Sequence, residues 1–203
     1  MKWLFAWLRA KKSRRALAEW ERHGRPAPPP HVVKQRVLRA YAERYHLKVF
    51  VETGTYRGDM VQAMKPLFHR IYSIELGDKL YHDARRRFKG DPHVELIHGD
   101  SSRELGPLMR RIDQPALFWL DGHYSAGDTA RGEKDTPVFE ELDHILGAPD
   151  LGHVVVIDDA RCFGSDPAYP TIEALREYVR AKRPHARIAV ADDSIRITSA
   201  EPG

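Results

Sequence analysis

Short apolar runs alternate with segments of helical periodicity along most of this chain. Five of the runs have the length and the β-branched or apolar composition of strands, and a helical pattern follows each of them. These predicted strands lie at 49–51, 71–75, 94–97, 116–120 and 153–157. The run at 116–120 is apolar throughout, as expected of a parallel strand covered on both faces. Two more short strands, at 187–190 and 195–198, join across Asp192 and Asp193 as a predicted hairpin.

The predicted helices fall before and between these strands. They cover 31–46, 60–67, 78–89, 102–112, 136–146 and 170–182. The alternation indicates the α/β class, with a Rossmann-like, doubly wound and mostly parallel sheet, helices on both faces and a C-terminal antiparallel hairpin. The chain has 203 residues, which is enough for one such domain at 31–203 and an N-terminal extension at 1–30.

The extension combines an apolar stripe with basic residues. Trp3, Leu4, Trp7 and Leu8 fall at helical spacing, and Lys11, Lys12, Arg14 and Arg15 follow them. The apolar part of residues 1–24 is too short for a signal peptide or a membrane-spanning helix. A basic helix with tryptophans suits peripheral contact with an anionic membrane surface. Docking on the domain, or on a second subunit in a homodimer, is the alternative, and the proline-rich stretch 25–30 is expected to form a stiff linker.

Charge and cysteine content narrow the class of protein. The formal net charge is +4, and much of the basic excess lies before residue 50. No sequence motif that reads nucleic acid accompanies it, so no nucleic-acid partner is expected. The single cysteine excludes a disulfide framework and a thiolate metal site. A reducing, cytoplasmic location is therefore predicted, with the extension reaching the inner membrane face if it binds lipid.

The first strand leads into a turn that contains two glycines, Gly54 and Gly58. Gly54 suits a turn conformation closed to other residues, and Gly58 is expected to let the following helix pack close to the strand. The pattern is not the G-x-G-x-x-G turn that binds a dinucleotide pyrophosphate. Glu52 would repel a phosphate but would favour a cationic ligand such as S-adenosylmethionine, which carries a sulfonium and an ammonium group. A turn with only a structural role is the alternative.

Acidic residues follow all five of the predicted parallel strands. They are Glu52, Glu75, Asp100, Asp121 and the pair Asp158–Asp159. In open α/β sheets the ligand crevice lies outside the carboxyl ends of the strands, so these acids are expected to meet at one crevice. Glu75 stands at the spacing from Gly54 at which an acid commonly bonds ribose hydroxyls. A solvent-exposed Glu75 is the alternative, and helix capping accounts for some of the acids, with Ser101 predicted as an N-cap.

Asp121, Asp158 and Asp159 come from predicted neighbouring strands. Three carboxylates in one crevice repel one another unless a cation neutralises them, and oxygen ligands favour Mg²⁺ or another hard divalent ion. Capping by Asp158 or Asp159, with Asp121 facing solvent, is the alternative. His123 could act as general base beside a metal-bound hydroxyl, or simply bond the backbone of its loop. The polar stretch 122–134 is predicted to be a loop long enough to form a lid.

Five motifs together resemble class I S-adenosylmethionine-dependent methyltransferases. The motifs are Val51 to Asp59, Ile71 to Glu75, Gly99 to Ser101, Trp119 to Tyr124 and Ile157 to Arg161. The resemblance spans about 31–198 and looks closest to a small bacterial group similar to metal-dependent sugar O-methyltransferases of the macrocin and aminocoumarin type. It implies a seven-stranded sheet of order 3-2-1-4-5-7-6.

The resemblance also implies roles for particular residues. Glu52, Gly54 and Gly58 would line the methionine end of the cofactor, Glu75 would bond the ribose, and Asp100 with Ser101 would flank the adenine. The full implied cofactor set is Glu52, Thr53, Gly54, Thr55, Tyr56, Gly58, Glu75, Leu76, Gly99, Asp100, Ser101 and Asp121. The implied metal ligands are Asp121, Asp158 and Asp159, and the implied catalytic residues are Asp121 and His123. Relatives commonly have an acid where this chain has His123, and catechol-type relatives have a lysine at the position of Tyr124.

The resulting hypothesis is transfer of a methyl group to a hydroxyl of a small molecule, such as a sugar or a secondary metabolite. The divalent ion would lower the pKa of that hydroxyl, and His123 would remove its proton. The oxygen would then attack the sulfonium methyl carbon, and the carbon–sulfur bond would break to leave S-adenosylhomocysteine. The rival hypotheses are a nicotinamide-dependent oxidoreductase, which Glu52 and the missing third glycine disfavour, and a non-catalytic nucleotide-binding or scaffold protein.

Overall fold

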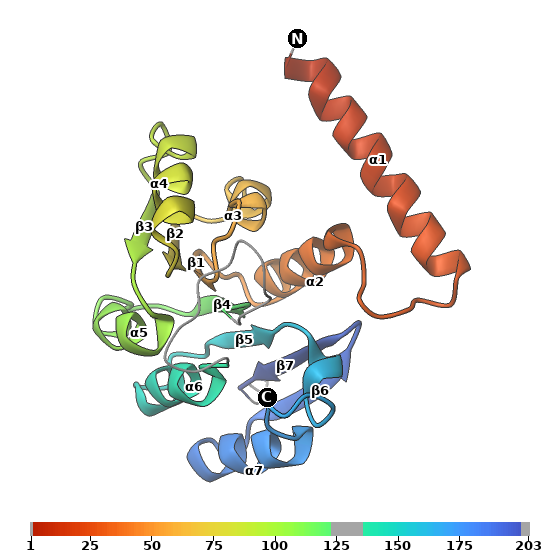
Figure 1. Cartoon of the computed structure of the whole chain (residues 1–203). Helices are drawn as coiled ribbons and strands as arrows, with labels where there is room; N and C mark the ends of the chain where they lie inside the picture. Colours follow the sequence, from red (N-terminus) through yellow and green to blue (C-terminus); the bar gives the residue numbers. More distant parts are fainter. Residues whose placement is uncertain (1, 123–135, 200–203) are drawn as a thin grey trace.

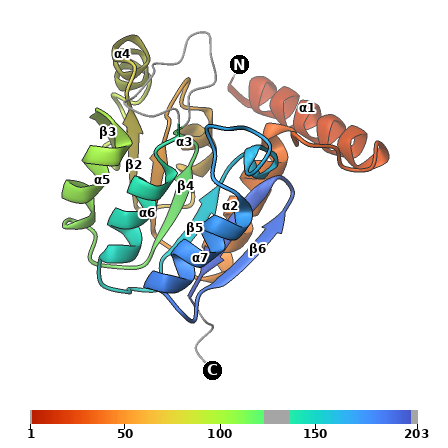
Figure 2. The same cartoon turned by 60° about the horizontal axis from the view of Figure 1, so that its bottom comes forward.

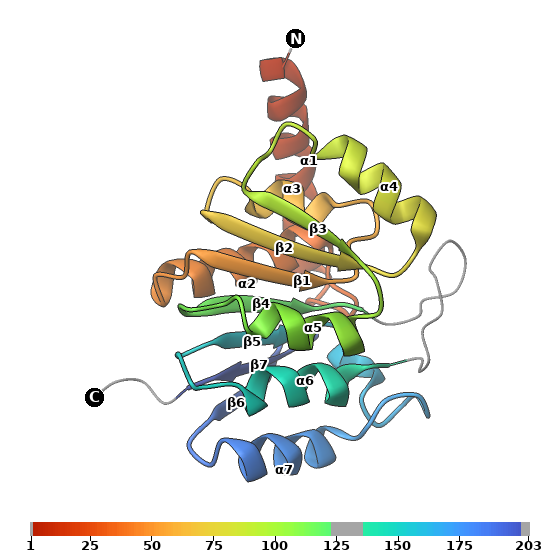
Figure 3. The ribbon, with the colours of Figure 1, turned by 90° about the vertical axis from the view of Figure 1, so that its left-hand side faces the viewer.

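The computed structural model describes residues 2–122 and 136–199, and these form one seven-stranded sheet flanked by helices (Figure 1). The strands are β1 (Val49–Thr53), β2 (Arg70–Glu75), β3 (Val94–His98), β4 (Ala116–Leu120), β5 (Val154–Ile157), β6 (Arg187–Ala191) and β7 (Ser194–Thr198). Their order is β3-β2-β1-β4-β5-β7-β6, and Figure 3 shows them stacked in this order. The first five pair in parallel, whereas β7 is antiparallel to β5 and β6. The predicted fold class and strand order are confirmed.

Helices cover both faces of the sheet, each over its own hydrophobic core. One face carries α2 (His31–Arg44), α3 (Asp59–Met64) and α4 (Asp78–Arg87), and the other carries α5 (Ser101–Met109), α6 (Val138–Gly147) and α7 (Ile172–Lys182). The strand residues alternate between the two cores: Phe50 packs toward α2, whereas Val51 packs toward α5 and α6. This two-sided burial explains why the central strands are apolar along their whole length.

The N-terminal extension forms a single helix, α1 (Lys2–Arg22), that projects outside the sheet and its covering helices (Figures 1 and 2). Among the side chains of α1 that the structure describes, the one buried against the rest of the protein lies at the C-terminal end of the helix. Trp20 is buried there, and its indole Nε1 donates to the carbonyl oxygen of Pro26 at 2.7 Å. The predicted stiff linker therefore folds back on the helix end, whereas Trp7 is exposed. Within the described residues, no helix is long and apolar enough to cross a membrane.

One local prediction needs correction, and one short element was not predicted. Asp100, not Ser101, is the N-cap of α5, because the Asp100 carboxylate accepts a hydrogen bond from the Ser102 amide at 2.9 Å. Aspartate caps a helix at least as well as serine, so the earlier of the two candidates takes the position. The chain after β5 forms a short 3₁₀ helix, η1 (Ala160–Cys162), which the hydrophobic pattern did not indicate.

Candidate functional site

The parallel strands end level with one another at one edge of the sheet. Thr53, the last residue of β1, lies opposite Ile74 of β2 and Leu120 of β4, and Leu120 lies opposite Ile157 of β5. The acids that follow these strands therefore gather along a single edge, as predicted. We call this the carboxyl edge, and its acids are Glu52, Glu75, Asp100, Asp121, Asp158 and Asp159.

The glycine turn after β1 is pressed against the chain that leaves β4. Gly54 has a φ of 82°, and a Cβ atom there would lie 2.5 Å from the carbonyl oxygen of Asp121. The Asp121 amide in turn donates to the Thr53 carbonyl oxygen at 3.2 Å. Only glycine meets both demands, because the left-handed conformation and the close backbone approach both exclude a side chain. The turn and Asp121 thus belong to one site.

Gly58 has a different neighbour from the one predicted. It is the N-cap of α3 with a φ of 74°, and a Cβ atom there would lie 2.6 Å from the ring of Phe88, the C-cap of α4. The expectation that Gly58 allows α3 to approach the strand was wrong, because its close contact is with a side chain of α4. The residue still fixes the shape of the turn.

Glu75 binds the glycine turn directly. One of its carboxylate oxygens accepts from the Tyr56 amide at 2.7 Å, and the other accepts from the Gly77 amide at 2.8 Å. The side chain is buried, and this burial raises the pKa of Glu75, although the two amides favour the charged form. Each carboxylate oxygen can accept a second hydrogen bond, so the predicted ribose contact is compatible with this geometry. The exposed-glutamate alternative does not apply, because Glu75 is only 5% exposed.

Glu52 lies inside the protein rather than on an open surface. It is 1% exposed, and Ser73 donates its hydroxyl to Oε2 of Glu52 at 2.5 Å. The hydroxyl oxygens of Ser73 and Thr55 are themselves 2.6 Å apart, so the three side chains form a buried chain of hydrogen bonds. Burial raises the pKa of Glu52 to about 8. At neutral pH the carboxyl therefore keeps its proton, and the fixed negative charge assumed from the sequence is absent until a cation approaches.

The residues predicted to flank the adenine lie at the end of β3. The Gly99 amide donates to the Glu75 carbonyl oxygen at 3.0 Å, which joins this end to that of β2. Asp100 uses one carboxylate oxygen to cap α5, and Ser101 is buried in the first turn. Leu76 is half-buried beside them, and Tyr56 is exposed at the turn. These residues flank the edge where the resemblance places the adenosine.

The two acids after β5, Asp158 and Asp159, form ion pairs with basic side chains of the protein. Lys34 of α2 donates to Asp158 Oδ2 and lies 3.7 Å from Asp159 Oδ1. Arg161 binds the same Asp159 oxygen at 2.7 Å. Burial lowers the pKa of Lys34, but the carboxylates of Asp158, Asp121 and Asp159 more than offset it, so the ammonium is held charged.

This arrangement does not fit the predicted magnesium site. A divalent ion would need carboxylate oxygens within about 2.0–2.6 Å, where Lys34 and Arg161 are already bonded. Across residues 2–122 and 136–199, no group of three or more His, Cys, Asp or Glu side chains is placed to hold a metal ion. His123, the predicted base, lies outside the described residues, as do Tyr124 and most of the predicted lid.

Sequence reasoning missed Lys34 and Glu141. Glu141 of α6 is 2% exposed, close to Thr53 and Gly122, and burial raises its pKa to about 7 although the Ser101 and Thr53 hydroxyls favour the charged form. Its Oε1 has no hydrogen-bond partner within the part of the chain that the structure describes. A signal for Glu141 existed, because it stands three residues after Val138 on the apolar face of its helix.

Comparisons with known proteins bear on the fold. No protein-family model and no curated protein sequence matches the chain. The O-methyltransferase TomG of Streptomyces achromogenes, solved with S-adenosylmethionine, is 18% identical with a TM-score of 0.61, covering 94% of this chain and 89% of TomG. An O-methyltransferase of Bacillus cereus, solved with S-adenosylhomocysteine, is 14% identical with a TM-score of 0.62, covering 94% and 91%. The N-methyltransferase NodS of Bradyrhizobium japonicum is 14% identical with a TM-score of 0.56, covering 86% and 99%.

These likenesses show the fold. The chain has the Rossmann-like architecture of S-adenosylmethionine-dependent methyltransferases, with the strand order that the resemblance implied. Because the similar structures include both O- and N-methyltransferases, the fold does not determine the acceptor atom.

Proposed function

We propose that this protein is an S-adenosylmethionine-dependent methyltransferase that methylates a hydroxyl of a small molecule. The cofactor would lie over the glycine turn, with its ribose at Glu75 and its charged methionine end toward Glu52. A sugar or another secondary metabolite is the acceptor class suggested by the resemblance. Because His123 lies outside the described residues, its role as the base stays a prediction.

The observation that carries the proposal is the hydrogen bond from the Tyr56 amide to Glu75. In dinucleotide-binding proteins the amides of this turn bind a pyrophosphate. Here a carboxylate already occupies the Tyr56 amide, and a second acid, Glu52, is buried one strand away. A phosphate on this turn would lose the Tyr56 amide to Glu75 and would lie beside that carboxylate, whereas a sulfonium or ammonium group would be attracted to it. This supports S-adenosylmethionine over a nicotinamide dinucleotide.

Metal assistance is not part of this proposal. After β5, Asp158 Oδ2 is bonded to Lys34 and Asp159 Oδ1 is bonded to Arg161, and both cations would repel a divalent ion placed at these oxygens. The acceptor hydroxyl would then be deprotonated by side chains of the protein, with the cofactor's positive charge favouring the developing oxyanion.

Calorimetric titration of the purified full chain with S-adenosylmethionine tests the proposal. We expect saturable binding, and loss of at least tenfold in affinity for Gly54→Ala, because the new Cβ would collide with the Asp121 carbonyl. Gly90→Ala is the matched control, since a Cβ at Gly90 meets no atom within 4 Å. Absence of heat at high micromolar ligand, together with saturable binding of NADH measured by fluorescence, would overturn the proposal.

We also propose that α1 makes peripheral contact with an anionic membrane, with docking on a second copy of the chain as the alternative. The support is the exposed Trp7 beside Lys11, whose Nζ lies 5.2 Å from the Trp7 ring centroid. Among the described side chains of this helix, the contact with the linker lies near its C-terminal end, at Trp20. Sedimentation with anionic vesicles should deplete the protein, and neutral vesicles should not. Equal sedimentation with both, or none with either, would contradict membrane contact.

A further inference from the structure

Lys34 reaches the carboxyl edge because of the direction of α2. The last turn of this helix leads into β1, whereas its first turn lies at the carboxyl ends of the sheet, where Lys34 contacts Asp158. Lys34 is the fourth residue of α2, and its side chain is 17% exposed. Its Nζ lies 5.9 Å from the ring centroid of Trp119 on β4 and also donates to Asp158. The ammonium is thus placed over the ends of β4 and β5.

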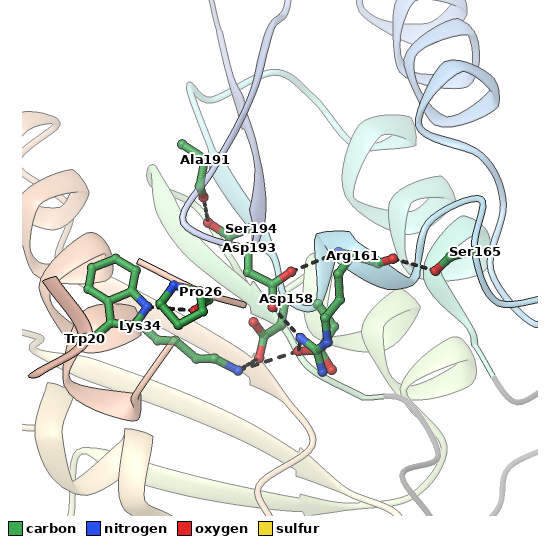
Figure 4. Close-up of polar contacts among 10 residues, drawn as sticks. Trp20, Pro26, Lys34, Asp158, Arg161, Ser165, Ala191, Asp193 and Ser194 are labelled. Atoms are coloured by element: carbon green, nitrogen blue, oxygen red, sulfur yellow. Dashed lines mark hydrogen bonds and ion pairs between the residues drawn. The ribbon is translucent and has the colours of Figure 1, made fainter. Parts of the chain in front are cut away.

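Both acids after β5 are paired within the protein. Lys34 donates to Asp158 Oδ2, and Arg161 binds both Asp159 and Asp193 through Nη1 (Figure 4). Figure 4 shows Lys34 and Arg161 approaching this cluster from opposite sides. The Asp158 side chain is only 2% exposed, so removing its cation would leave a buried charge in a poorly solvating environment.

A lysine ammonium and a divalent ion can each neutralise neighbouring carboxylates. The three carboxylates of Asp121, Asp158 and Asp159 repel one another, and a positive charge among them removes that repulsion. Lys34 supplies such a charge, because its Nζ donates to Asp158 Oδ2 and lies 3.7 Å from Asp159 Oδ1. A metal ion at Asp158 Oδ2 would have to displace Lys34 and would also be repelled by it.

We infer that Lys34 is the resident cation of the Asp158–Asp159 pair and takes the place that the sequence motif assigns to a divalent ion. Lys34 is then a positioning residue, which fixes Asp158 at the ends of β4 and β5. The second Asp158 oxygen, Oδ1, is buried and lacks a hydrogen-bond partner among the described residues, so it is available to a hydroxyl or amino group. This last step rests on the proposed function, whereas the pairing itself does not.

Mn²⁺ titration of the full chain, followed by the paramagnetic resonance signal of free Mn²⁺, tests the inference without cofactor or acceptor. We expect wild type and Asp158→Asn to give the same binding curve. Lys34→Met should gain at least tenfold in apparent Mn²⁺ affinity, because it leaves the carboxylates without their cation. Lys34→Arg, which keeps the charge, should not gain.

A melting experiment gives an independent readout. Lys34→Met should melt about 10 °C below wild type, as expected for breaking a buried ion pair in a chain of this size. Lys79→Met, at an exposed lysine of α4, should melt with wild type.

The inference is overturned if wild type binds Mn²⁺ and Asp158→Asn weakens that binding tenfold. It is also overturned if Lys34→Met gives the wild-type Mn²⁺ curve or melts within about 2 °C of wild type. Since none of these measurements uses S-adenosylmethionine, failure of the inference and failure of the proposed function are distinguishable. If Lys34→Met does not fold, the comparison of wild type with Asp158→Asn still decides the question.

Discussion

The carboxyl edge neutralises its acids in two different ways. At β1 and β2, Glu52 and Glu75 receive hydrogen bonds from a serine hydroxyl and two backbone amides. At β5, Asp158 and Asp159 are bonded to Lys34 and to Arg161. The first group, which we call the hydrogen-bonded half, has no salt bridge to either glutamate among the described residues, whereas the second, the ion-paired half, does.

The difference indicates where a positively charged ligand would bind. Burial without a cation raises the pKa values of both glutamates, and that of Glu52 reaches about 8, so an arriving sulfonium or ammonium group would favour the charged form of each carboxyl. The ion-paired half has its positive charges already in place and gains less from another. Two sets of acids at equivalent strand ends therefore have different chemistry, which depends on the elements that pack above them.

The largest effect is expected for Glu52→Gln, and it should depend on pH. Burial raises the folded-state pKa of Glu52 from 4.5 to about 8. Between these values the unfolded chain releases the proton that the folded protein keeps, so wild-type stability falls as the pH rises. The glutamine lacks this titration, and its amide oxygen can still accept from Ser73. We expect the variant to be more stable than wild type by about 4 kcal/mol at pH 8, measured by urea unfolding.

That difference should shrink steadily as the pH is lowered and should vanish below about pH 4.5, where both states carry the proton. Glu177→Gln, at an exposed position of α7, serves as the control and should show no such trend. A stability difference for Glu52→Gln that is constant from pH 5 to pH 8 would mean that the carboxyl is charged in the folded protein. The contrast between the two halves would then be wrong.

The ion-paired half is tested by Asp193→Asn. Asp193 accepts from both the backbone amide and the guanidinium of Arg161, and its side chain is 2% exposed. The amide substitution preserves shape but removes the charge, so Arg161 loses one of its two carboxylates. We expect a loss of about 2 kcal/mol in the free energy of unfolding. Because a charge pair is involved, the loss should be smaller at high salt.

Asp192→Asn is the matched control in the same turn. Asp192 pairs with Arg196 at 2.8 Å, but its side chain is 30% exposed, so its loss should be below about 1 kcal/mol. Equal losses for the two variants would indicate that burial does not strengthen the Arg161 pair.

The sequence was sufficient to predict the strands of the sheet, but it did not predict which side chains form ion pairs at the site. The apolar runs and the helical periodicities predicted every strand and the helices between them, because local hydrophobic patterning follows from burial on one or both faces. The acids at the strand ends were also visible. What converts Asp158 from a metal ligand to half of an ion pair is Lys34, which stands 124 residues earlier in the chain. No local pattern reports a contact of that range.

The sequence analysis also missed the direction of α2 and the protonation of Glu52. The antiparallel course of α2 and β1 follows from the fold, so it could have placed the first turn of α2, and with it Lys34, at the carboxyl edge. The burial of Glu52 could not be predicted from the sequence, because an acid at a strand end has the same sequence pattern whether it faces solvent or the interior. Its elevated pKa arises from that burial, a property of the packed structure.

The smallest effect tests how the hydrogen-bonded half is connected. Thr55→Val replaces a buried hydroxyl with a methyl group of similar size, and it removes the contact between Thr55 and Ser73. We expect a loss of about 1 kcal/mol, typical of one buried hydrogen bond. A double-mutant cycle with Ser73→Ala should give a coupling of similar size, because the second substitution removes the same bond. Strict additivity would show that the two hydroxyls do not interact, and Glu52 would then depend on Ser73 alone.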